Sequence, residues 1–437
     1  MPTNTATPAL LRSLTPDARL LFATRFIRLF AYGSLSVILV FYLVSLGLTE
    51  SQTGLLLSLT LAGDVLVSLL LTTWADRIGR RRMLVLGAFL MAAAGLAFAF
   101  TRNFFFLVLA GTIGVISPSG NEVGPFLSIE QAALSHVVTP TTRTLVFAWY
   151  TLAGSLATAI GALVGGTLTH TLQTNAMSPV NSYRVVVIGY AALGIFLALL
   201  FVRLSAAAEV HDTGEKSVRD LKSFFGVARS HRVVLKLSGL FALDAFAGGF
   251  VIQSFAAYWF YLRFGTNPAT LGGIFFWANL FAGISALLAS RLASRIGLVK
   301  TMVYTHLPSN ILLILVPLMP TLPLAIAILL LRFSISQMDV PTRQSYTMAV
   351  VTPEERSAAA GITGVARTTG ASISPLFVGF LFAHPSWINI PFLLAGALKI
   401  LYDLLLYRAF VQLPPPEETV SDAGDIPQPT TKRIPGS

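Results

Sequence analysis

Apolar runs of membrane length follow one another along almost the whole chain of 437 residues. A spanning helix needs about 20 apolar residues, and only 11 % of this chain is charged, against about 25 % in soluble domains. The pattern therefore predicts an all-α polytopic membrane protein with twelve transmembrane helices. Hydropathy and turn signals place these spans at about 18–46, 53–75, 81–101, 104–137, 143–169, 184–204, 234–262, 270–293, 300–319, 322–351, 357–383 and 388–410.

The twelve predicted spans form two sets of six. The segment between the sets, which contains EVHDTGEKSVRDLKS, is polar and mixed in charge, as is typical of a linker. After the last span the chain has three consecutive prolines and scattered acids, a composition typical of disorder. We expect a cytoplasmic N-terminal tail (1–16), a six-helix bundle (17–204), a cytoplasmic linker (205–232), a second six-helix bundle (233–411) and a disordered cytoplasmic tail (412–437).

Basic residues gather on one side of the predicted spans. The formal net charge is +11, yet the loops of one side hold only Arg102, Arg184 and Arg263. Because lysine and arginine are enriched in cytoplasmic loops, both termini are predicted to be cytoplasmic, in a plasma (inner) membrane. The charge orients the chain in the lipid bilayer, and we do not interpret it as nucleic-acid binding. The chain contains no cysteine, which excludes disulfides and cysteine-ligated zinc.

Two short motifs recur in the second half of the chain. Val-Val-Thr-Pro-x-x-Arg occurs at 137–143 and again at 350–356, a displacement of 213 residues. Ala-x-Arg-Ile-Gly occurs at 75–79 and again at 293–297, a displacement of 218. The halves are therefore predicted to be structural repeats. The difference of five residues predicts an insertion in the first half, best located in the Gly- and Pro-rich segment 117–125.

The fourth predicted span is too long for one straight membrane helix. Residues 104–137 would measure about 50 Å at 1.5 Å per residue, against a hydrocarbon core of about 30 Å. Pro118, Gly120, Gly124 and Pro125 favour a break inside it. Broken backbone at membrane depth is tolerated only beside protein or a water-filled cavity. We expect a functional break, with an ordinary proline kink as the alternative.

The turn between the second and third spans, TTWADRIGRRRML at 72–84, carries five charged residues. It resembles the signature between the second and third helices of the major facilitator superfamily. Thr72 stands where that signature has glycine, and the matching residues are Asp76, Arg77, Gly79, Arg80, Arg81 and Leu84.

The resemblance implies two six-helix bundles, a central cavity, and alternating access by rocking of the halves. It also implies that Asp76 and the arginines form a gating latch at the cytoplasmic side. The alternative is that the arginines only anchor the topology. In the repeated copy, Ser294 replaces the acid and Leu298 and Val299 replace two arginines, so we expect a one-sided latch centred on Asp76.

The fifth and eleventh predicted spans carry small residues at corresponding places. This helix-packing motif resembles the antiporter signature of drug-exporting family members, although Ala162 stands where that signature has proline. The resemblance favours antiport. The alternative is close helix packing alone, which small residues permit. The motif residues are Gly161, Gly165, Gly166, Pro375 and Gly379.

Charged residues inside the spans are the strongest indication of a site. A charge at the bilayer centre costs about 2.5–3.5 kcal/mol on insertion scales, so such side chains face a cavity or one another. The predicted substrate and proton pathway comprises Arg28, Asp64, Glu122, Glu130, Asp244, Arg332, Asp339, Arg343 and Arg367.

Particular pairs and roles follow from depth and spacing. Arg28 and Asp244 lie at similar depth in equivalent spans and are expected to pair across the halves in one conformation. Asp339 and Arg343, four residues apart, share a helix face and can pair. The repeat places Arg343 at the position equivalent to Glu130, so that a base opposes an acid.

We expect Glu122 to be the first protonatable carboxylate, because burial disfavours its charge. Glu130 and Asp339 are the next candidates, and a static ion pair is the alternative for each. The pair Lys399 and Asp403 is interpreted as structural and peripheral. Four arginines in the spans indicate an anionic or zwitterionic substrate, unless they are partnered within the protein.

Several other classes find no support in the sequence. There is no Gly-Lys dipeptide and hence no P-loop, no Gly-x-Ser-x-Gly motif, and no histidine pair at helical spacing. We therefore expect no enzyme, no metal and no cofactor. The prediction is a monomeric secondary transporter that exports a small organic solute against protons (antiport). The alternatives are a proton-coupled uptake symporter for an organic anion and a non-transporting solute sensor on the same fold.

Overall fold

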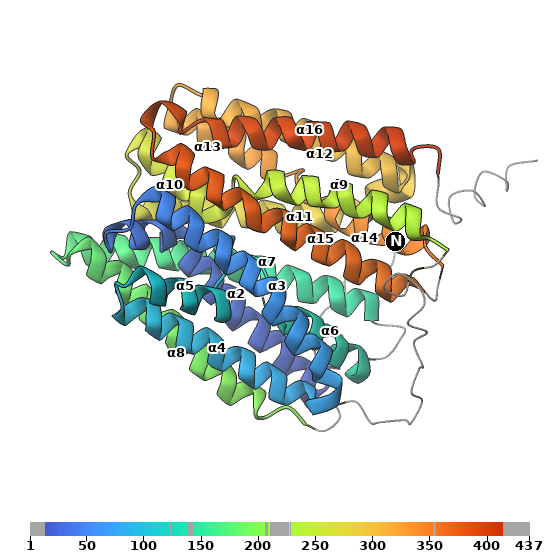
Figure 1. Cartoon of the computed structure of the whole chain (residues 1–437), viewed down its shortest axis with the longest axis horizontal. Coiled ribbons are helices and arrows are strands. Elements are labelled where there is room, and N and C mark those ends of the chain that lie inside the picture. Colours follow the sequence, from blue (N-terminus) through green and yellow to red (C-terminus); the bar gives the residue numbers. More distant parts are fainter. Residues whose placement is uncertain are drawn as a thin grey trace, which may run out of the picture.

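The computed structural model describes residues 14–122, 124–138, 143–205, 209, 227, 229–352 and 355–413. Every regular element in these residues is a helix, and the helices form two neighbouring groups (Figure 1). The first group, the N half, comprises α2 (Pro16–Ser45), α3 (Glu50–Ile78), α4 (Arg80–Phe100), α5 (Phe104–Ile113), α6 (Phe126–Val137), α7 (Arg143–Thr174) and α8 (Pro179–Phe201).

The second group, the C half, repeats this order. Short 3₁₀ segments follow the helices of the ninth and eleventh spans. Its elements are α9 (His231–Gly249), α10 (Gln253–Phe264), α11 (Pro268–Ile296), α12 (Leu298–Leu315), η3 (Val316–Leu318), α13 (Leu322–Phe333), α14 (Asp339–Ala349), α15 (Arg356–Phe382), η5 (Pro385–Trp387) and α16 (Ile390–Phe410).

Ten of the twelve predicted spans are long and apolar enough to cross a membrane, by length and composition. The other two, the fourth and the tenth, are each divided into two short helices, α5 with α6 and α13 with α14. The break predicted in the fourth span is confirmed. Gly120 and Gly124 adopt φ values of +70° and +77° within it, which side chains other than glycine rarely accept.

The break in the tenth span was not predicted from the sequence. Twelve residues (114–125) separate α5 from α6, whereas five (334–338) separate α13 from α14. The longer connection in the N half agrees with the insertion inferred from the repeat. The seventh span is also interrupted, between α9 and α10 at residues 250–252.

Local capping explains where the principal helices begin and turn. Thr49 and Gln52 form a capping box at the start of α3, and the side chain of Asn267 accepts from the backbone of Thr270 at the start of α11. Gly79 and Gly297, which the repeat relates, make the turns α3–α4 and α11–α12 with φ values of +114° and +86°. Both repeats thus use glycine at the same turn.

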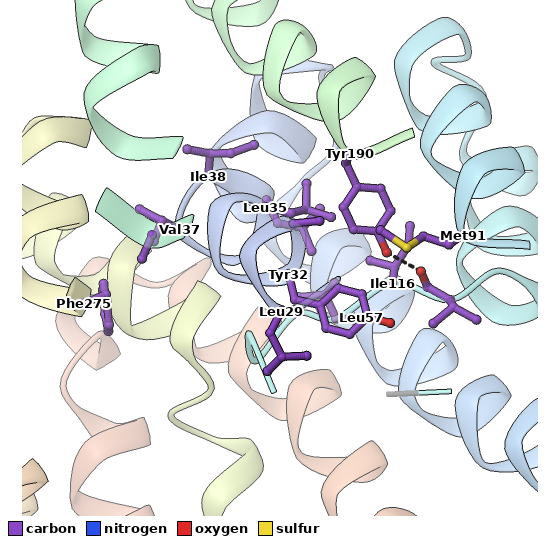
Figure 2. Packing of buried hydrophobic residues seen from close by; sticks show 14 of the residues in the cluster. Leu29, Tyr32, Leu35, Val37, Ile38, Leu57, Met91, Ile116, Tyr190 and Phe275 are labelled. Carbon is purple, nitrogen blue, oxygen red and sulfur yellow. Dashed lines mark hydrogen bonds between the residues drawn. The ribbon is translucent and has the colours of Figure 1, made fainter. Parts of the chain in front are cut away.

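The helix α2 lies in the centre of the apolar core. Its Tyr32 ring stacks on Tyr190 of α8, with centroids 6.2 Å apart, and both rings are buried (Figure 2). The Tyr190 hydroxyl donates a hydrogen bond to the carbonyl oxygen of Val115, in the broken segment. The apolar core therefore also supports the break.

We call the end of the bundle where α8 ends and α9 begins the linker face, and the opposite end the hairpin face. Near the hairpin face the two halves approach through glycines. A Cβ atom on Gly54 of α3 would lie 2.4 Å from the Pro375 carbonyl oxygen of α15, beside Gly379. A Cβ atom on Gly166 of α7 would lie 2.3 Å from the carbonyl oxygen of Pro268, beside Gly272 of α11.

These two glycine contacts are related by the sequence repeat. Gly54 and Gly272 are 218 residues apart, and Gly166 and Gly379 are 213 apart, the same displacements as the two repeated motifs. Each contact joins a helix of one half to a helix of the other, α3 with α15 and α7 with α11. The interface between the halves is therefore pseudo-symmetric.

Polar contacts join the interrupted spans of the two halves. The backbone N–H and the hydroxyl of Ser254, in the first turn of α10, donate to the Pro118 carbonyl oxygen at 3.2 Å and 2.5 Å. Gln253 donates to the Ser36 hydroxyl at 2.7 Å and accepts from Asn279 at 2.9 Å. The break in the fourth span thus faces the break in the seventh.

Candidate functional site

A buried ion pair joins the first and fourth spans of the N half. Arg28 of α2 donates from Nη1 to Oε1 of Glu130 at 2.6 Å and from Nη2 to Oε2 at 2.7 Å, so both carboxylate oxygens of this α6 residue are bound. Both side chains are fully buried. Such a bidentate arginine–carboxylate pair is among the strongest hydrogen-bonded arrangements in proteins.

Further groups complete this N-half cluster. Glu122, from the broken segment, lies 2.7 Å from Arg25 Nη1 and 3.2 Å from Arg28 Nη2. The hydroxyl of Tyr150 donates to Glu130. Two arginines and two carboxylates balance one another, and Glu122 is the more exposed of the two acids.

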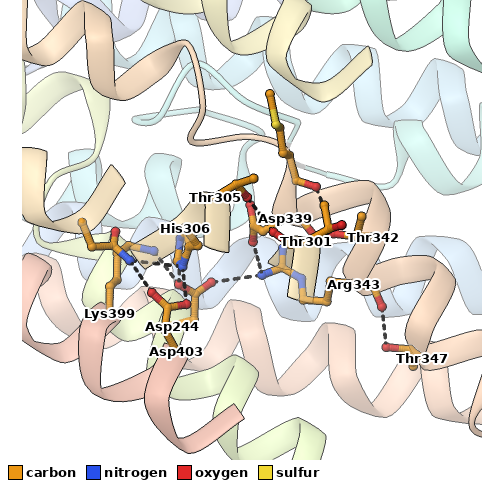
Figure 3. A network of polar contacts seen from close by, with 12 residues as sticks. Asp244, Thr301, Thr305, His306, Asp339, Thr342, Arg343, Thr347, Lys399 and Asp403 are labelled. Atoms are coloured by element: carbon orange, nitrogen blue, oxygen red, sulfur yellow. Dashed lines mark hydrogen bonds and ion pairs between the residues drawn. The ribbon is translucent and has the colours of Figure 1, made fainter. Parts of the chain in front are cut away.

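The C half contains a second buried cluster, in which Asp244 of α9 takes the central place. Arg343 of α14 lies 3.1 Å from Asp244 and 3.1 Å from Asp339, and Lys399 of α16 lies 2.5 Å from the other oxygen of Asp244 (Figure 3). The predicted pairing of Asp339 with Arg343 is confirmed. Lys399, which was expected to pair with Asp403 on its own helix, binds Asp244 instead.

Two further members of this cluster, His306 and Asn310 of α12, were not predicted from the sequence. His306 Nδ1 lies 2.8 Å from Asp403 Oδ1, and Asn310 donates to Asp403 Oδ2 at 2.9 Å. His306 Nε2 lies 3.9 Å from Asp244 Oδ1. Asp403 therefore pairs with His306 rather than with Lys399 on its own helix. A histidine and an asparagine four residues apart in an apolar span were the available signal.

The two clusters occupy equivalent places with opposite polarity. Arg28 and Asp244 lie in equivalent spans, and Glu130 and Arg343 are equivalent through the 213-residue repeat. Each half joins its first span to its fourth by an ion pair, base to acid in one half and acid to base in the other. The cross-half pair expected between Arg28 and Asp244 is not formed in this conformation, since both have partners in their own half.

Asp64 of α3 supports the break in the fourth span. Its Oδ1 accepts a hydrogen bond from the backbone N–H of Gly124 and another from the Ser68 hydroxyl at 3.4 Å. A carboxylate thus satisfies a donor that no helix satisfies here. The position of Asp64 therefore indicates a role in backbone support.

We expect Asp64→Ala to lower the free energy of unfolding by about 1.5–3 kcal/mol, the contribution typical of a hydrogen bond to a charged group. Asp64→Asn retains an acceptor oxygen for the Gly124 N–H and should cost clearly less. Denaturation of both purified variants followed by circular dichroism measures the difference. Equal losses in the two variants would contradict the assigned role of the hydrogen bond.

Arg332 of α13 and Arg367 of α15 are half-buried and differ from the buried arginines of the two clusters. In both, the buried Nε atom has no hydrogen-bond partner, and within the described ranges neither guanidinium group forms an ion pair. Arg332 lies over the ring of Phe333 at 4.9 Å. Both lie within electrostatic range of Asp339 and Asp244.

The charged turn of the first half binds the linker. Gly79 separates α3 from α4, and the backbone N–H groups of Arg80 and Arg81 donate to Glu209 at 2.7 Å and 3.1 Å. Anions are stabilised at a helix N-terminus in this way. Asp76 was expected to be the centre of a gating latch at this turn, but the side chains of Asp76 and Arg77 lie outside the described residues, and the contact of Glu209 was not predicted.

The glycines of the fifth span lie at close helix contacts. A Cβ atom on Gly161 would lie 2.1 Å from the Phe30 carbonyl oxygen, and one on Gly165 would lie 2.5 Å from that of Ser34, both in α2. Gly166 faces the other half, as described above. The motif therefore brings α7 against helices of both halves. Among the described residues, no three His, Asp or Glu side chains are grouped so as to hold a metal ion.

Comparison with known proteins identifies the family. The model of the Major Facilitator Superfamily matches residues 21–338 and 245–435, which together span nearly the whole chain. The chain is 32 % identical over 422 residues to YJR124C of Saccharomyces cerevisiae, an uncharacterised membrane protein, with 90 % of this chain and 94 % of that protein covered.

Similarity to named transporters is more distant. The efflux pump azaK of Aspergillus niger is 32 % identical over 107 residues, 23 % of this chain and 21 % of that protein. A bacterial homologue of the human lysosomal transporter Spinster, in an inward-facing, unoccupied conformation, has the same fold, with a TM-score of 0.71 at 15 % identity over 91 % of this chain and 97 % of that chain. The chain is therefore a membrane transporter of the major facilitator superfamily.

Proposed function

We propose that this protein is a proton-coupled secondary transporter that exports a small organic solute by alternating access. The observation that carries the proposal is the pair of buried charged clusters, one in each half, with carboxylates next to broken helices. Burying a charged side chain within the membrane costs free energy, and such side chains mark ion or substrate pathways in membrane proteins. Such carboxylates can exchange protons when a conformational change alters their partners.

Export is favoured over uptake by two indications. The fifth-span glycines resemble the antiporter signature, and a quarter of the chain is similar to a protein named as an efflux pump. In the proposed cycle, proton binding and solute binding alternate as the halves rock and the glycine contacts of the hairpin face form and separate. The arginine turn at the linker face, with Asp76, is proposed as the gating latch of that motion.

A second candidate function is uptake of an organic anion by proton symport. Arg332 and Arg367 favour it, because within the described part of the chain neither forms an ion pair, and a half-buried cation without an ion-pair partner is costly unless a ligand supplies a counter-charge. Arg28 and Arg343 give no such support, since carboxylates bind both. Arg332→Gln and Arg367→Gln should then weaken binding of organic anions and leave neutral solutes unaffected.

Transport into inverted membrane vesicles tests the proposed export. With an acidic lumen, we expect candidate solutes to accumulate inside, and a protonophore to abolish the accumulation. Arg343→Gln should lose it, whereas Arg263→Gln, which changes a charge at the hairpin face, should retain it. Accumulation that is insensitive to the protonophore would refute proton coupling, and pH-driven accumulation only in right-side-out vesicles would establish uptake instead.

A further inference from the structure

The contact between His306 and Asp403 requires a shared proton. A ring nitrogen and a carboxylate oxygen 2.8 Å apart are held by a hydrogen between them. When Nδ1 carries that hydrogen, it donates to Asp403 Oδ1, and Asn310 donates to the other oxygen at 2.9 Å. Both carboxylate oxygens are then satisfied, and Nε2 is the ring atom left to gain or lose a proton.

A proton on Nε2 of His306 would affect the ion pair between Asp244 and Lys399. Nε2 faces Asp244 Oδ1 at 3.9 Å, the same oxygen that Lys399 Nζ binds at 2.5 Å. In the neutral ring, Nε2 presents a lone pair to a carboxylate. In the protonated ring, it presents a donor to that carboxylate and competes with Lys399. His306 thus lies between two acids, Asp244 and Asp403, from different helices.

Acidic and basic groups both surround the His306 ring, and they have opposite effects on a proton bound there. From α9 the ring faces Asp244, and from α16 it faces Asp403 and makes a T-shaped contact with the Tyr402 ring, while Lys399 of α16 binds the same Asp244 oxygen. The three aspartates of the C-half cluster exceed its two bound bases, Arg343 and Lys399, by one charge, which a protonated His306 would balance. Arg332 and Arg367 lie within electrostatic range of Asp244, so their charges also enter this balance.

We propose that His306 is a proton-binding site of this transporter, protonated at Nε2 and held by Asp403. Its proton competes with Lys399 for Asp244, so that protonation weakens the ion pair that joins α16 to α9. The assignment of this site to transport coupling rests on the proposed proton-coupled function. The binding of the proton does not.

Nitrogen-15 NMR of histidine-labelled protein, purified without any solute, tests the site with the proton itself as the probe. As the pH is lowered from about 9 to about 4, we expect one buried ring to gain a proton and become charged. This signal should be absent in His306→Gln and present in His384→Gln, whose exposed side chain lies at the hairpin face. Should His306→Gln not fold, a variant without the other five histidines isolates the same signal.

A second variant separates proton binding from mere packing. Lys399→Met removes the competing cation, so the proton affinity of His306 should rise about tenfold or more. A His306 ring that keeps one charge state across the whole pH range, or an affinity unchanged in Lys399→Met, overturns the proposal. If His306 titrates as expected while vesicle transport ignores a protonophore, the site stands and the proposed proton coupling fails.

Discussion

Replacing Glu130 by glutamine is expected to lower the free energy of unfolding by about 3–5 kcal/mol and to abolish transport. Glu130 receives both Nη groups of Arg28 and the hydroxyl of Tyr150, and it is fully buried. Glutamine keeps the shape but leaves the buried guanidinium with Glu122 as its remaining counter-charge, which Arg25 shares. Reversible unfolding in mild detergent and vesicle transport measure the two effects.

Glu50→Gln is the matched control for this substitution. Glu50 is partly exposed at the hairpin face, where it accepts one hydrogen bond from Tyr258 at 3.0 Å. We expect it to cost at most about 1 kcal/mol. The exchange of Arg28→Glu with Glu130→Arg, which copies the polarity of the C half, should recover part of the lost stability. A loss in Glu130→Gln no larger than that in Glu50→Gln would disprove the structural importance of the ion pair.

Alanine at Gly54 or Gly166 is expected to reduce transport at least tenfold by separating the halves at the hairpin face. In each variant the added Cβ would lie less than 2.5 Å from a carbonyl oxygen of the opposite half, far inside contact distance. A change of side-chain rotamer cannot relieve this overlap, because the atom that the new Cβ would contact belongs to the backbone of the opposite helix. The substitution therefore disfavours this conformation relative to one in which the hairpin face is open.

The change in the conformational equilibrium can be measured by cysteine labelling. The chain contains no cysteine, so single cysteines can be introduced near Ser36 and Gln253 and labelled with a membrane-impermeant maleimide without background. We expect faster labelling from the hairpin face in Gly54→Ala and Gly166→Ala. Gly273→Ala is the control, because a Cβ there has no neighbour within 4 Å although the residue adjoins Gly272. Unchanged labelling and transport in Gly54→Ala would exclude a role for the glycine contact.

Much of the fold was predictable from local patterns. Hydropathy placed the spans, Pro118, Gly120 and Gly124 indicated the break in the fourth span, and two motifs revealed the repeat. The break at 334–338 was missed because no comparable cluster of proline and glycine marks it. The backbone at this break is held by contacts with other helices. For example, the backbone N–H of Gln337 donates a hydrogen bond to the Ser285 hydroxyl at 3.1 Å.

The site was only partly predictable, for a related reason. Spacing of four residues predicted the pair of Asp339 with Arg343, because helical geometry alone brings such side chains together. The same rule failed for Lys399 and Asp403. Lys399 binds Asp244 of α9, and Asp403 pairs with His306 of α12. Distant partners in a low-dielectric interior outweigh a neighbour on the same helix when they offer more hydrogen bonds.

By itself the sequence determined that this chain spans a membrane many times, that its halves repeat, and that charges are buried in the spans. Those conclusions depend on composition and periodicity, which are local properties. Only the tertiary structure decided which charges meet: Arg28 with Glu130, Asp244 with Arg343 and Lys399, and His306 with Asp403. The physical reason is that an ion pair between helices depends on how the helices are rotated and packed, and these are fixed by contacts throughout the bundle.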